Sequence, residues 1–257
     1  MLLAIDVGNT HMVIGVFDQD RILCQWRVKT DRDSTADELA SLFHDLFTLK
    51  KMHFTDITDV IIASVVPPMQ SAWAKFTEKY LSLRPLLVSN TMKTGMKILI
   101  DSPKELGADR IVNAVAAYEK YHAALVVVDF GTAITFDCIS AKGEYLGGAI
   151  APGIAISLDA LDMRTAKLPR VDISSPPQNA IGKNTVEAIK SGILFGYGSM
   201  VDGLISKISK ELQPDIPKVI ATGGMAELIA PYAKTIESVE PHLTLEGLYL
   251  LYERNRP

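Results

Sequence analysis

Two short segments of the sequence place a carboxylate, a glycine and a hydroxyl directly after an apolar run. They are Asp6-Val7-Gly8-Asn9-Thr10 and Asp129-Phe130-Gly131-Thr132-Ala133. A glycine turn lets backbone N–H groups approach phosphate oxygens, and the Asn and Thr side chains add donors. The carboxylate can hold Mg²⁺ through water. The two segments therefore predict a pair of phosphate loops, one in each half of the chain.

Each segment also suits an ordinary hairpin turn, and the first segment alone leaves the two interpretations equal. The same order of Asp, Gly and Thr after an apolar run occurs in both halves of the chain, and this repetition favours phosphate binding. A third feature, Gly223-Gly224, follows the apolar run Val219–Thr222. A glycine pair there permits close approach of a flat ligand such as adenine or ribose, although it suits a turn equally well. The sequence holds no Walker-type or dinucleotide glycine motif that competes with these loops.

The segment Gly107-Ala108-Asp109-Arg110 stands at the expected start of a helix. An acid beside an arginine at a helix amino terminus can hold a hydroxyl group and a carboxylate of one small substrate. A helix cap with an exposed ion pair is the alternative, and the segment by itself favours that alternative. The five histidines show no metal-ligand spacing, and Ser64 lacks the context of a nucleophile elbow. The sequence therefore predicts neither a zinc site nor a serine hydrolase.

Apolar periodicity indicates the elements that must position these segments. Thr35 and Glu38 stand three residues apart before an amphipathic pattern, which predicts a capped helix up to Phe47. Strands are expected at Leu2–Ile5, Met12–Phe17, Arg21–Lys29, Val60–Val66 and Pro85–Val88, with a second helix over Ser71–Leu83. A strand meander followed by helix, strand, helix and strand is typical of a ribonuclease-H-like lobe.

The second half repeats the pattern of strand, turn and strand, which indicates two related lobes. The expected elements are strands at Ala124–Asp129, Ile134–Ile139, Glu144–Ile150 and Lys218–Thr222, and helices at Arg110–His122, Thr185–Ile208 and His242–Tyr252. We therefore predict an α/β fold of two ribonuclease-H-like lobes. Residues 1–117 form the expected N-terminal lobe, and residues 118–257 form the expected C-terminal lobe.

The composition is that of a folded protein with a buried core, because 48% of the 257 residues are hydrophobic and 22% are charged. The net charge of −4, without a block of basic and aromatic residues, argues against nucleic-acid binding. No apolar run approaches the roughly 20 residues of a membrane span, and the apolar amino terminus is too short for a signal sequence. We expect a cytoplasmic protein in which Cys24 and Cys138 are free thiols.

The ordered set of loops resembles the phosphate-1, phosphate-2 and adenosine loops of the acetate and sugar kinase, heat-shock protein and actin superfamily. Within that superfamily the chain is similar to type III pantothenate kinases over nearly its whole length. The segments that carry this resemblance are Gly8–Thr10, Ala63–Pro68, Gly107–Arg110, Gly147–Gly153 and Gly182–Thr185. The resemblance implies the actin-like ATPase fold and transfer of the ATP γ-phosphoryl group to the 4′-hydroxyl of pantothenate. This reaction is the first step of coenzyme A synthesis.

The resemblance also implies roles for individual residues. Asp109 is the expected general base, Arg110 the partner of the pantothenate carboxylate, and Asp129 the ligand of a monovalent cation, K⁺ or NH₄⁺. The expected ATP-binding residues, with Mg²⁺ accompanying the nucleotide, are Asp6, Val7, Gly8, Asn9, Thr10, His11, Met12, Val13 and Thr132. The expected substrate-binding residues are Gly107, Ala108, Asp109, Arg110 and Thr185. Family members form homodimers, and Thr185 is expected to reach the substrate at the dimer interface.

One position departs from the family pattern, because Ile100 stands where many members have a tyrosine. This departure changes the expected wall of the pantothenate pocket. Two other functions stay open from the residues alone. A different phosphotransferase of the same fold would act on a sugar, an acid or a polyphosphate. A nucleotide-binding regulator would hold ATP without converting a small substrate, and the intact Asp109 argues against it.

Overall fold

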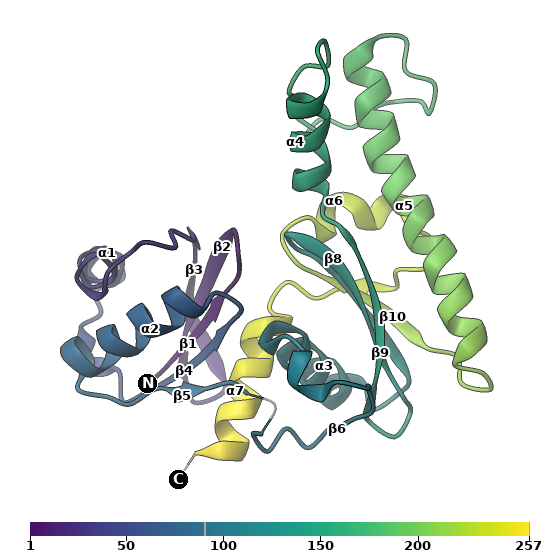
Figure 1. Cartoon of the computed structure of the whole chain (residues 1–257). Coiled ribbons are helices and arrows are strands. Elements are labelled where there is room, and N and C mark those ends of the chain that lie inside the picture. The colour runs from purple at the N-terminus through teal and green to yellow at the C-terminus, as the bar shows by residue number, and fades with distance from the viewer. Residues whose placement is uncertain (90, 257) are drawn as a thin grey trace. The chain divides into compact units, whose positions relative to one another are not determined.

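Apolar residues of the chain gather around two separate β-sheets. The computed structural model describes residues 1–89 and 91–256, and Figure 1 labels its elements. Each sheet belongs to its own compact unit. The first unit comprises Met1–Lys97, Asp101–Glu119 and His242–Pro257, and the second comprises Ile98–Ile100 and Lys120–Pro241.

The sheet of the first unit has the strand order β3-β2-β1-β4-β5. Its strands are β1 (Leu2–Val7), β2 (His11–Asp18), β3 (Arg21–Lys29), β4 (Asp59–Ser64) and β5 (Leu86–Leu87). β1 pairs antiparallel with β2 and parallel with β4. β1 and β4 are buried over most of their length because both faces of these central strands are covered.

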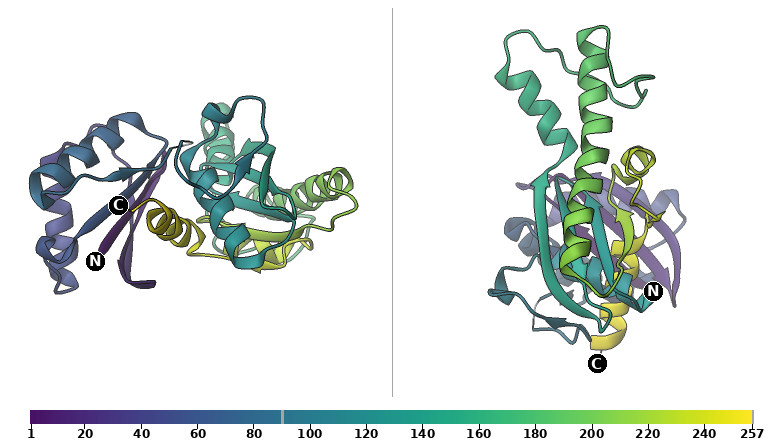
Figure 2. Two further views of the ribbon diagram at one scale, coloured as in Figure 1. Left: turned by 90° about the horizontal axis from the view of Figure 1, so that it is seen from below. Right: turned by 90° about the vertical axis from the view of Figure 1, so that its right-hand side faces the viewer.

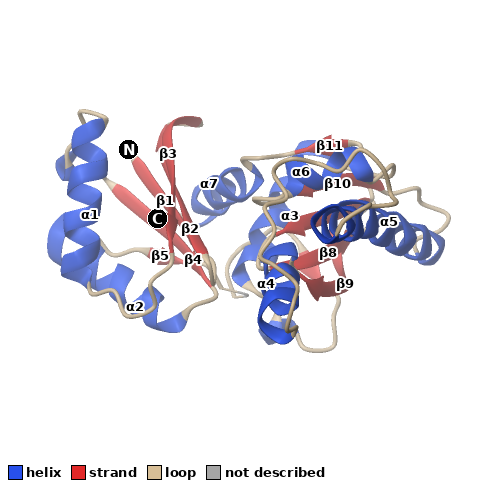
Figure 3. Cartoon of the chain, turned by 90° about the horizontal axis from the view of Figure 1, so that it is seen from above, coloured by secondary structure: helices blue, strands red, loops and turns tan. Residues whose placement is uncertain are grey.

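Helices cover both faces of this sheet, as Figure 3 shows. α1 (Ala36–Leu49) and α2 (Pro67–Phe76) lie on one face, and α7 (Leu243–Asn255) lies on the other. Aromatic rings fill the layer under α1 and α2. Phe43 and Trp73, both fully buried, meet edge to face with their ring centroids 4.8 Å apart.

The C-terminal helix α7 packs against β1, β2 and β4 of the first unit (Figure 2, left). It does so through a stripe of buried leucines, Leu243, Leu245, Leu248 and Leu251. On the same side, Thr244 Oγ1 donates to the buried Asn113 Oδ1 of α3 (Ala108–Tyr121) at 2.8 Å. The first compact unit therefore includes α7, whereas the predicted N-terminal lobe ended at residue 117. The continuous lobes 1–117 and 118–257 stay a prediction.

The sheet of the second unit has the strand order β11-β10-β7-β8-β9-β6. Its strands are β6 (Lys97–Ile98), β7 (Leu125–Phe130), β8 (Ala133–Ile139), β9 (Glu144–Pro152), β10 (Lys218–Thr222) and β11 (Ser238–Val239). β7 pairs antiparallel with β8 and parallel with β10, which repeats the pairing of β1 with β2 and β4. The predicted recurrence of strand, turn and strand is thus confirmed as the same arrangement around a central strand.

The long helix α5 (Thr185–Glu211) packs on this second sheet. Its buried residues Ile193, Leu194, Val201 and Ile205 join the core formed by β7, β8 and β10. α4 (Ile154–Arg164) leaves the end of β9 and runs beside the first half of α5 (Figure 1; Figure 2, right). The short helix α6 (Ala226–Ile229) follows β10.

The predicted elements are present, with differences at their ends. The capping box of α1 is confirmed, because Thr35 and Glu38 exchange hydrogen bonds between side chain and backbone. α2 begins at Pro67, four residues before the predicted start, since proline suits the first turn of a helix. α4 was not predicted because Ile154 is the one buried residue it contributes, so no apolar stripe marks it. The remaining short helical turns are Phe54–Asp56, Thr77–Leu81, Pro103–Glu105 and Ala230–Tyr232.

Both cysteines are free thiols, as the sequence predicts. Within residues 1–89 and 91–256, no helix combines the length and the apolar character needed to cross a membrane.

Candidate functional site

The turn between β1 and β2 carries the first predicted phosphate loop. Gly8 N–H donates to the His11 carbonyl at 3.1 Å and closes the turn. Asn9 and Thr10 at its tip are exposed, whereas Val7 and Met12 point into the core. Val7 and Met12 can therefore offer a nucleotide only backbone groups. Side-chain donors at the tip come from Asn9, Thr10 and His11.

The segment after β3 holds this turn in place. Thr30 Oγ1 donates to the Gly8 carbonyl at 2.7 Å, and Thr30 N–H donates to the Thr10 carbonyl at 2.9 Å. Arg32 Nη2 donates to Asn9 Oδ1 at 2.9 Å. The loop is therefore fixed at three successive residues, which is more support than a plain hairpin turn needs.

His11 begins β2, opposite Lys29, and its Nδ1 lies 3.3 Å from Arg27 Nη2. Burial lowers the pKa of His11, and the charges of Arg27 and Lys29 lower it further. The charged form of the ring is therefore disfavoured in the ligand-free protein. Its ring nitrogens can offer a nucleotide a hydrogen bond.

The segment Gly107–Arg110 forms the start of α3, as predicted. Ile111 N–H donates to the Gly107 carbonyl at 3.2 Å, so the first turn of the helix closes on the glycine. Asp109 is half-buried, and its Oδ1 accepts from the Arg110 N–H at 2.9 Å. A Cβ at position 107 would lie 2.5 Å from Asp109 Oδ1, so a side chain there would displace the carboxylate. Glycine is therefore required next to this acid.

The pKa of the Asp109 carboxyl is raised. Burial is the main cause, and it outweighs the opposing effects of the Arg110 N–H and the Arg110 charge. An exposed helix-cap carboxylate would not behave in this way. The structure therefore disfavours the simple cap with an exposed ion pair, which the segment alone favoured.

The first unit brings Gly107–Arg110 to the same sheet edge as the phosphate loop. Val65, which follows β4, donates its N–H to the Val7 carbonyl at 3.1 Å, directly before the loop. Its side chain also lies 3.8 Å from the position of a Cβ at Gly107. Asp109 and the loop therefore flank the carboxyl ends of β1 and β4. This is the edge at which open α/β sheets bind their ligands.

The turn between β7 and β8 carries the second predicted phosphate loop. Asp129 lies near the end of β7, level with Thr222 at the end of β10, and Gly131 N–H donates to the Ala133 carbonyl at 3.1 Å. Gly223 follows with a φ of +92°, and a Cβ there would clash with Asp129 Oδ1 and with the backbone of Phe130. The Gly223-Gly224 turn and the second loop are thus in close contact, as a shared ligand site requires.

Gly153 extends this cluster toward α4. A Cβ at position 153 would overlap the carbonyl oxygens of Gly131 and Thr132, and Gly153 N–H donates to the Thr132 carbonyl at 3.1 Å. The Gly-Gly-Ala-Ile-Ala-Pro-Gly segment therefore supports the Thr132 backbone. Thr132 and Asp129 are both half-buried.

Thr185 lies apart from these loops within the second unit. It is the exposed first residue of α5 and lines a cavity of about 670 Å³ between α4 and α5. The other residues that line this cavity are Leu161, Leu168, Gly182, Lys183, Asn184, Ala188, Ile189, Gly192 and Ile193. The structure thus brings Asp129, Thr132 and Gly223 together and places Thr185 in a separate, mostly apolar hollow.

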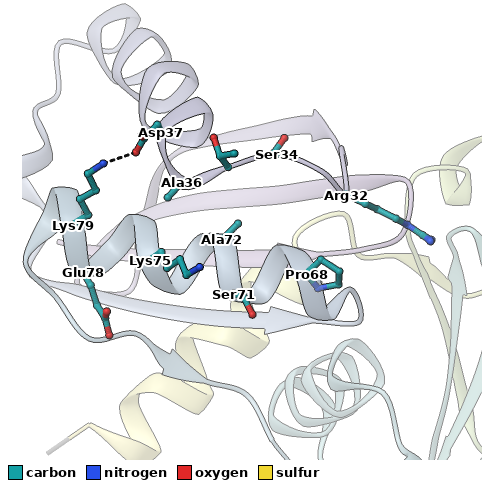
Figure 4. Close-up of a pocket in the computed structure, with 11 residues that line it drawn as sticks. Arg32, Ser34, Ala36, Asp37, Pro68, Ser71, Ala72, Lys75, Glu78 and Lys79 are labelled. Carbon is teal, nitrogen blue, oxygen red and sulfur yellow. Dashed lines mark hydrogen bonds and ion pairs between the residues drawn. The ribbon is translucent and has the colours of Figure 1, made fainter.

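A second cavity, of about 770 Å³, lies in the first unit between the start of α1 and α2 (Figure 4). At one end Lys79 Nζ forms an ion pair with Asp37 Oδ1 at 2.7 Å. Arg32 stands at the opposite end. This cavity was not predicted, because its polar lining comes from segments about 40 residues apart.

Comparison with known proteins identifies the family. The model of the type III pantothenate kinase family matches residues 2–207. The chain belongs to the type III pantothenate kinase family. The type III pantothenate kinase of Citrifermentans bemidjiense is 54% identical over 256 residues and covers 100% of both chains. That of Desulfatibacillum aliphaticivorans is 56% identical over 254 residues, covering 99% of this chain and 98% of its own.

A solved structure shows the fold of the type III pantothenate kinase chain. A protein from Sinorhizobium meliloti assigned as a 2-dehydro-3-deoxygalactonokinase superposes with a TM-score of 0.58 at 12% identity. The match covers 100% of this chain and 97% of that one. With its two mixed sheets, the chain therefore has the α/β actin-like ATPase fold of the sugar kinases, as predicted.

Thr30 and Arg32 are functional candidates that reasoning from the sequence missed. A signal was available, since both follow the strand that pairs with the phosphate-loop strand β2. Their side-chain targets are Gly8 and Asn9, more than 20 residues earlier, and only the folded sheet shows that they meet.

Replacement of Asp109 by Asn is expected to raise the free energy of unfolding at neutral pH. The folded carboxyl has a raised pKa, so the native state binds its proton more tightly than the unfolded chain does. Stability is lost as pH rises from the ordinary aspartate pKa of about 4 through the raised folded value. The amide oxygen of the substituted side chain would keep the hydrogen bond from the Arg110 N–H while carrying no charge.

Urea unfolding of the wild type and the Asp109→Asn variant, at about pH 4 and pH 8, measures this effect. The stability difference should grow with pH. Asp45→Asn is the control, because the Asp45 side chain is 81% exposed. A variant less stable than wild type at the higher pH would contradict the assignment of a buried, destabilising charge.

Proposed function

We propose that this chain phosphorylates the 4′-hydroxyl of pantothenate with ATP, and that Asp109 is its general base. The reaction itself is that of the family to which the chain belongs, and it is the first step of coenzyme A synthesis. The observation that carries the assignment of Asp109 is its half-buried carboxyl of raised pKa, at the same sheet edge as the first phosphate loop.

The phosphates of ATP are bound by backbone and side-chain donors of the first loop. Gly8 keeps the turn tight, while Asn9 and Thr10 present exposed donors. Asp6, half-buried at the end of β1, offers the oxygen ligands that Mg²⁺ prefers and would hold the metal of the nucleotide through water. When bound, Mg²⁺ neutralises charge on the phosphate oxygens. Thr132, in the second loop, provides a further ATP contact.

Asp109 accepts the proton of the attacking hydroxyl. Phosphoryl transfer needs little covalent chemistry from the protein. The main task of the protein is to place the attacking hydroxyl in line with the phosphate and to accept the hydroxyl proton. A carboxylate whose pKa is raised is a stronger base than an exposed one. At the first turn of α3 the Arg110 N–H donates to its Oδ1 and orients the carboxyl group.

Pantothenate carries a carboxylate, and Arg110 is its partner. A guanidinium beside the amino terminus of α3 joins a full positive charge to the favourable helix dipole. Ile100, in place of a tyrosine, lies in the second unit, 3.5 Å from the position of a Cβ at Gly147. The isoleucine side chain has no hydroxyl group that could form a hydrogen bond.

Asp109→Asn is expected to lower kcat by about 10²–10⁴-fold, because the amide cannot accept the hydroxyl proton. ATP binding should be unaffected. A coupled ADP-release assay with ATP, Mg²⁺, K⁺ and pantothenate, with mass spectrometry of the product, measures the reaction. Asp45→Asn serves again as the exposed control.

An unchanged kcat in the Asp109→Asn variant would remove Asp109 from the role of base. A folded, ATP-binding wild type that leaves pantothenate unmodified would overturn the proposed function. It would favour a kinase of another substrate or a nucleotide-binding regulator.

Asp129 is proposed as the ligand of the monovalent cation, K⁺ or NH₄⁺. The residues present fit such an ion, because the donor is a hard carboxylate oxygen. The space around it exists only because residue 223 is glycine, since a Cβ there would clash with Asp129 Oδ1. When bound, the cation lowers the negative charge around the nucleotide phosphates.

Asp129→Asn is expected to abolish the advantage of K⁺ over Na⁺, because the neutral amide holds a cation far less well. Initial rates in KCl and NaCl at equal ionic strength measure this preference for the variant and for the wild type. Asp215→Asn, an exposed residue of the same unit, is the control and should retain the wild-type preference. A K⁺ preference that survives in Asp129→Asn would place the cation elsewhere.

The chain is further proposed to form a homodimer through α4 and the start of α5. Large apolar side chains are exposed there, with Met163 on α4 at 75% and Ile181 before α5 at 84%. Burial of such side chains against a second copy would release them from water. The location of Thr185 beside the cavity between these helices supports the predicted substrate contact at the interface. The cytoplasmic location stays a prediction.

Met163→Asp combined with Ile181→Asp is expected to convert the dimer to monomers, because each charge would have to be buried in the interface. Size-exclusion chromatography with light scattering measures the mass. Ile216→Asp is the matched control, since Ile216 is 92% exposed but lies in the loop after α5, away from α4 and the start of α5. A doubly substituted protein that keeps the dimer mass would contradict this interface.

A further inference from the structure

Arg32 approaches the first phosphate loop from the segment after β3. Its Nη2 donates to Asn9 Oδ1 at 2.9 Å. The remainder of the segment is already anchored, because the buried Thr30 bonds the loop backbone at Gly8 and Thr10. The Arg32 bond is therefore not needed to close the loop, and it acts on the Asn9 side chain alone.

A guanidinium group donates hydrogen bonds and accepts none. An Asn side chain facing Arg32 must therefore present its carbonyl oxygen to it. The Asn9 NH₂ group, on the other branch of the same amide, then points away from Arg32. Without such a partner, an exposed Asn side chain can turn its amide either way round, and half of these orientations would direct an oxygen at a phosphate.

We propose that Arg32 is a positioning residue that fixes the orientation of the Asn9 amide, so that its NH₂ group faces the ATP phosphates. This rests on the proposed function of residues 6–13 as the ATP-binding loop. Arg32 acts through Asn9 and makes no phosphate contact of its own. Its positive charge is secondary to its lack of a hydrogen-bond acceptor.

The location of Arg32 is consistent with this role. The residue is exposed and stands at one end of the cavity between α1 and α2, away from the Asp37–Lys79 ion pair at the other end (Figure 4). Within the described part of the chain, its guanidinium bonds the Asn9 side chain and joins no ion pair. Substitution of Arg32 is therefore expected to leave the fold intact.

A double-mutant cycle between Arg32→Ala and Asn9→Ala tests the proposal on the full-length protein. KM for ATP is measured at saturating pantothenate, and the Kd of a fluorescent ATP analogue is measured without pantothenate. Each single variant is expected to raise both values about tenfold, the size of one hydrogen bond to a charged partner. In the Asn9→Ala background, Arg32→Ala should change them less than about twofold, because its target is gone.

Two conservative variants separate amide orientation from loop support. Arg32→Lys keeps a group that only donates and should restore most of the ATP affinity. Arg32→Gln can present a donor or an acceptor and should behave like Arg32→Ala. Arg21→Ala, an exposed arginine at the other end of β3, is the control and should match the wild type.

The outcomes distinguish failure of the proposed ATP loop from failure of the proposed role of Arg32. If Asn9→Ala leaves ATP binding unchanged, the assignment of the ATP loop fails and this inference fails with it. If Asn9→Ala weakens binding but the Arg32 and Asn9 effects add, Arg32 contacts ATP by itself and only this inference is overturned. Equal affinities in Arg32→Gln and Arg32→Lys would likewise overturn it.

Discussion

One constraint governs the rest of the structure. Backbone segments must approach each other closely at the ends of the two central strands, β1 and β7. Phosphate oxygens are bound by backbone N–H groups only where no side chain intervenes. Gly131, Gly153 and Gly223 meet this condition around the second loop, where added Cβ atoms would strike backbone or Asp129. Each loop joins a central strand to its antiparallel neighbour, so both are backed by buried sheet.

The start of α3 places Asp109, the proposed base, in a partly dehydrated position. Burial works against the charge of Asp109, and the Arg110 N–H and guanidinium only partly offset this cost. A group that is costly to ionise in the folded state contributes nothing to stability at neutral pH. The fold is therefore stabilised elsewhere, in the cores beneath the two sheets, and a buried acid of raised pKa is consistent with the proposed role of Asp109.

Hydrogen bonds from the segment after β3 add to the packing that supports the first loop. Thr30 bonds two carbonyl groups of the turn, and Arg32 bonds the Asn9 side chain. Directional bonds of this kind set the orientation of individual donors, which apolar contacts cannot do. If the first loop binds ATP as proposed, this directionality organises its donors before the ligand binds.

The sequence by itself determined the strand–turn–strand openings, the capped helix α1 and the loops that contain Asp6 and Asp129, because these depend on local periodicity and on glycine, Asn and Thr spacing. It also placed Asp109 and Arg110 at a helix start. Only the tertiary structure decided that α7 packs on the first sheet, that Gly223 contacts Asp129, and that Thr30 and Arg32 hold a loop more than 20 residues earlier. The raised pKa of Asp109 also came from the fold. Such contacts join distant segments, and burial depends on all the neighbours that folding assembles, so no local pattern encodes them.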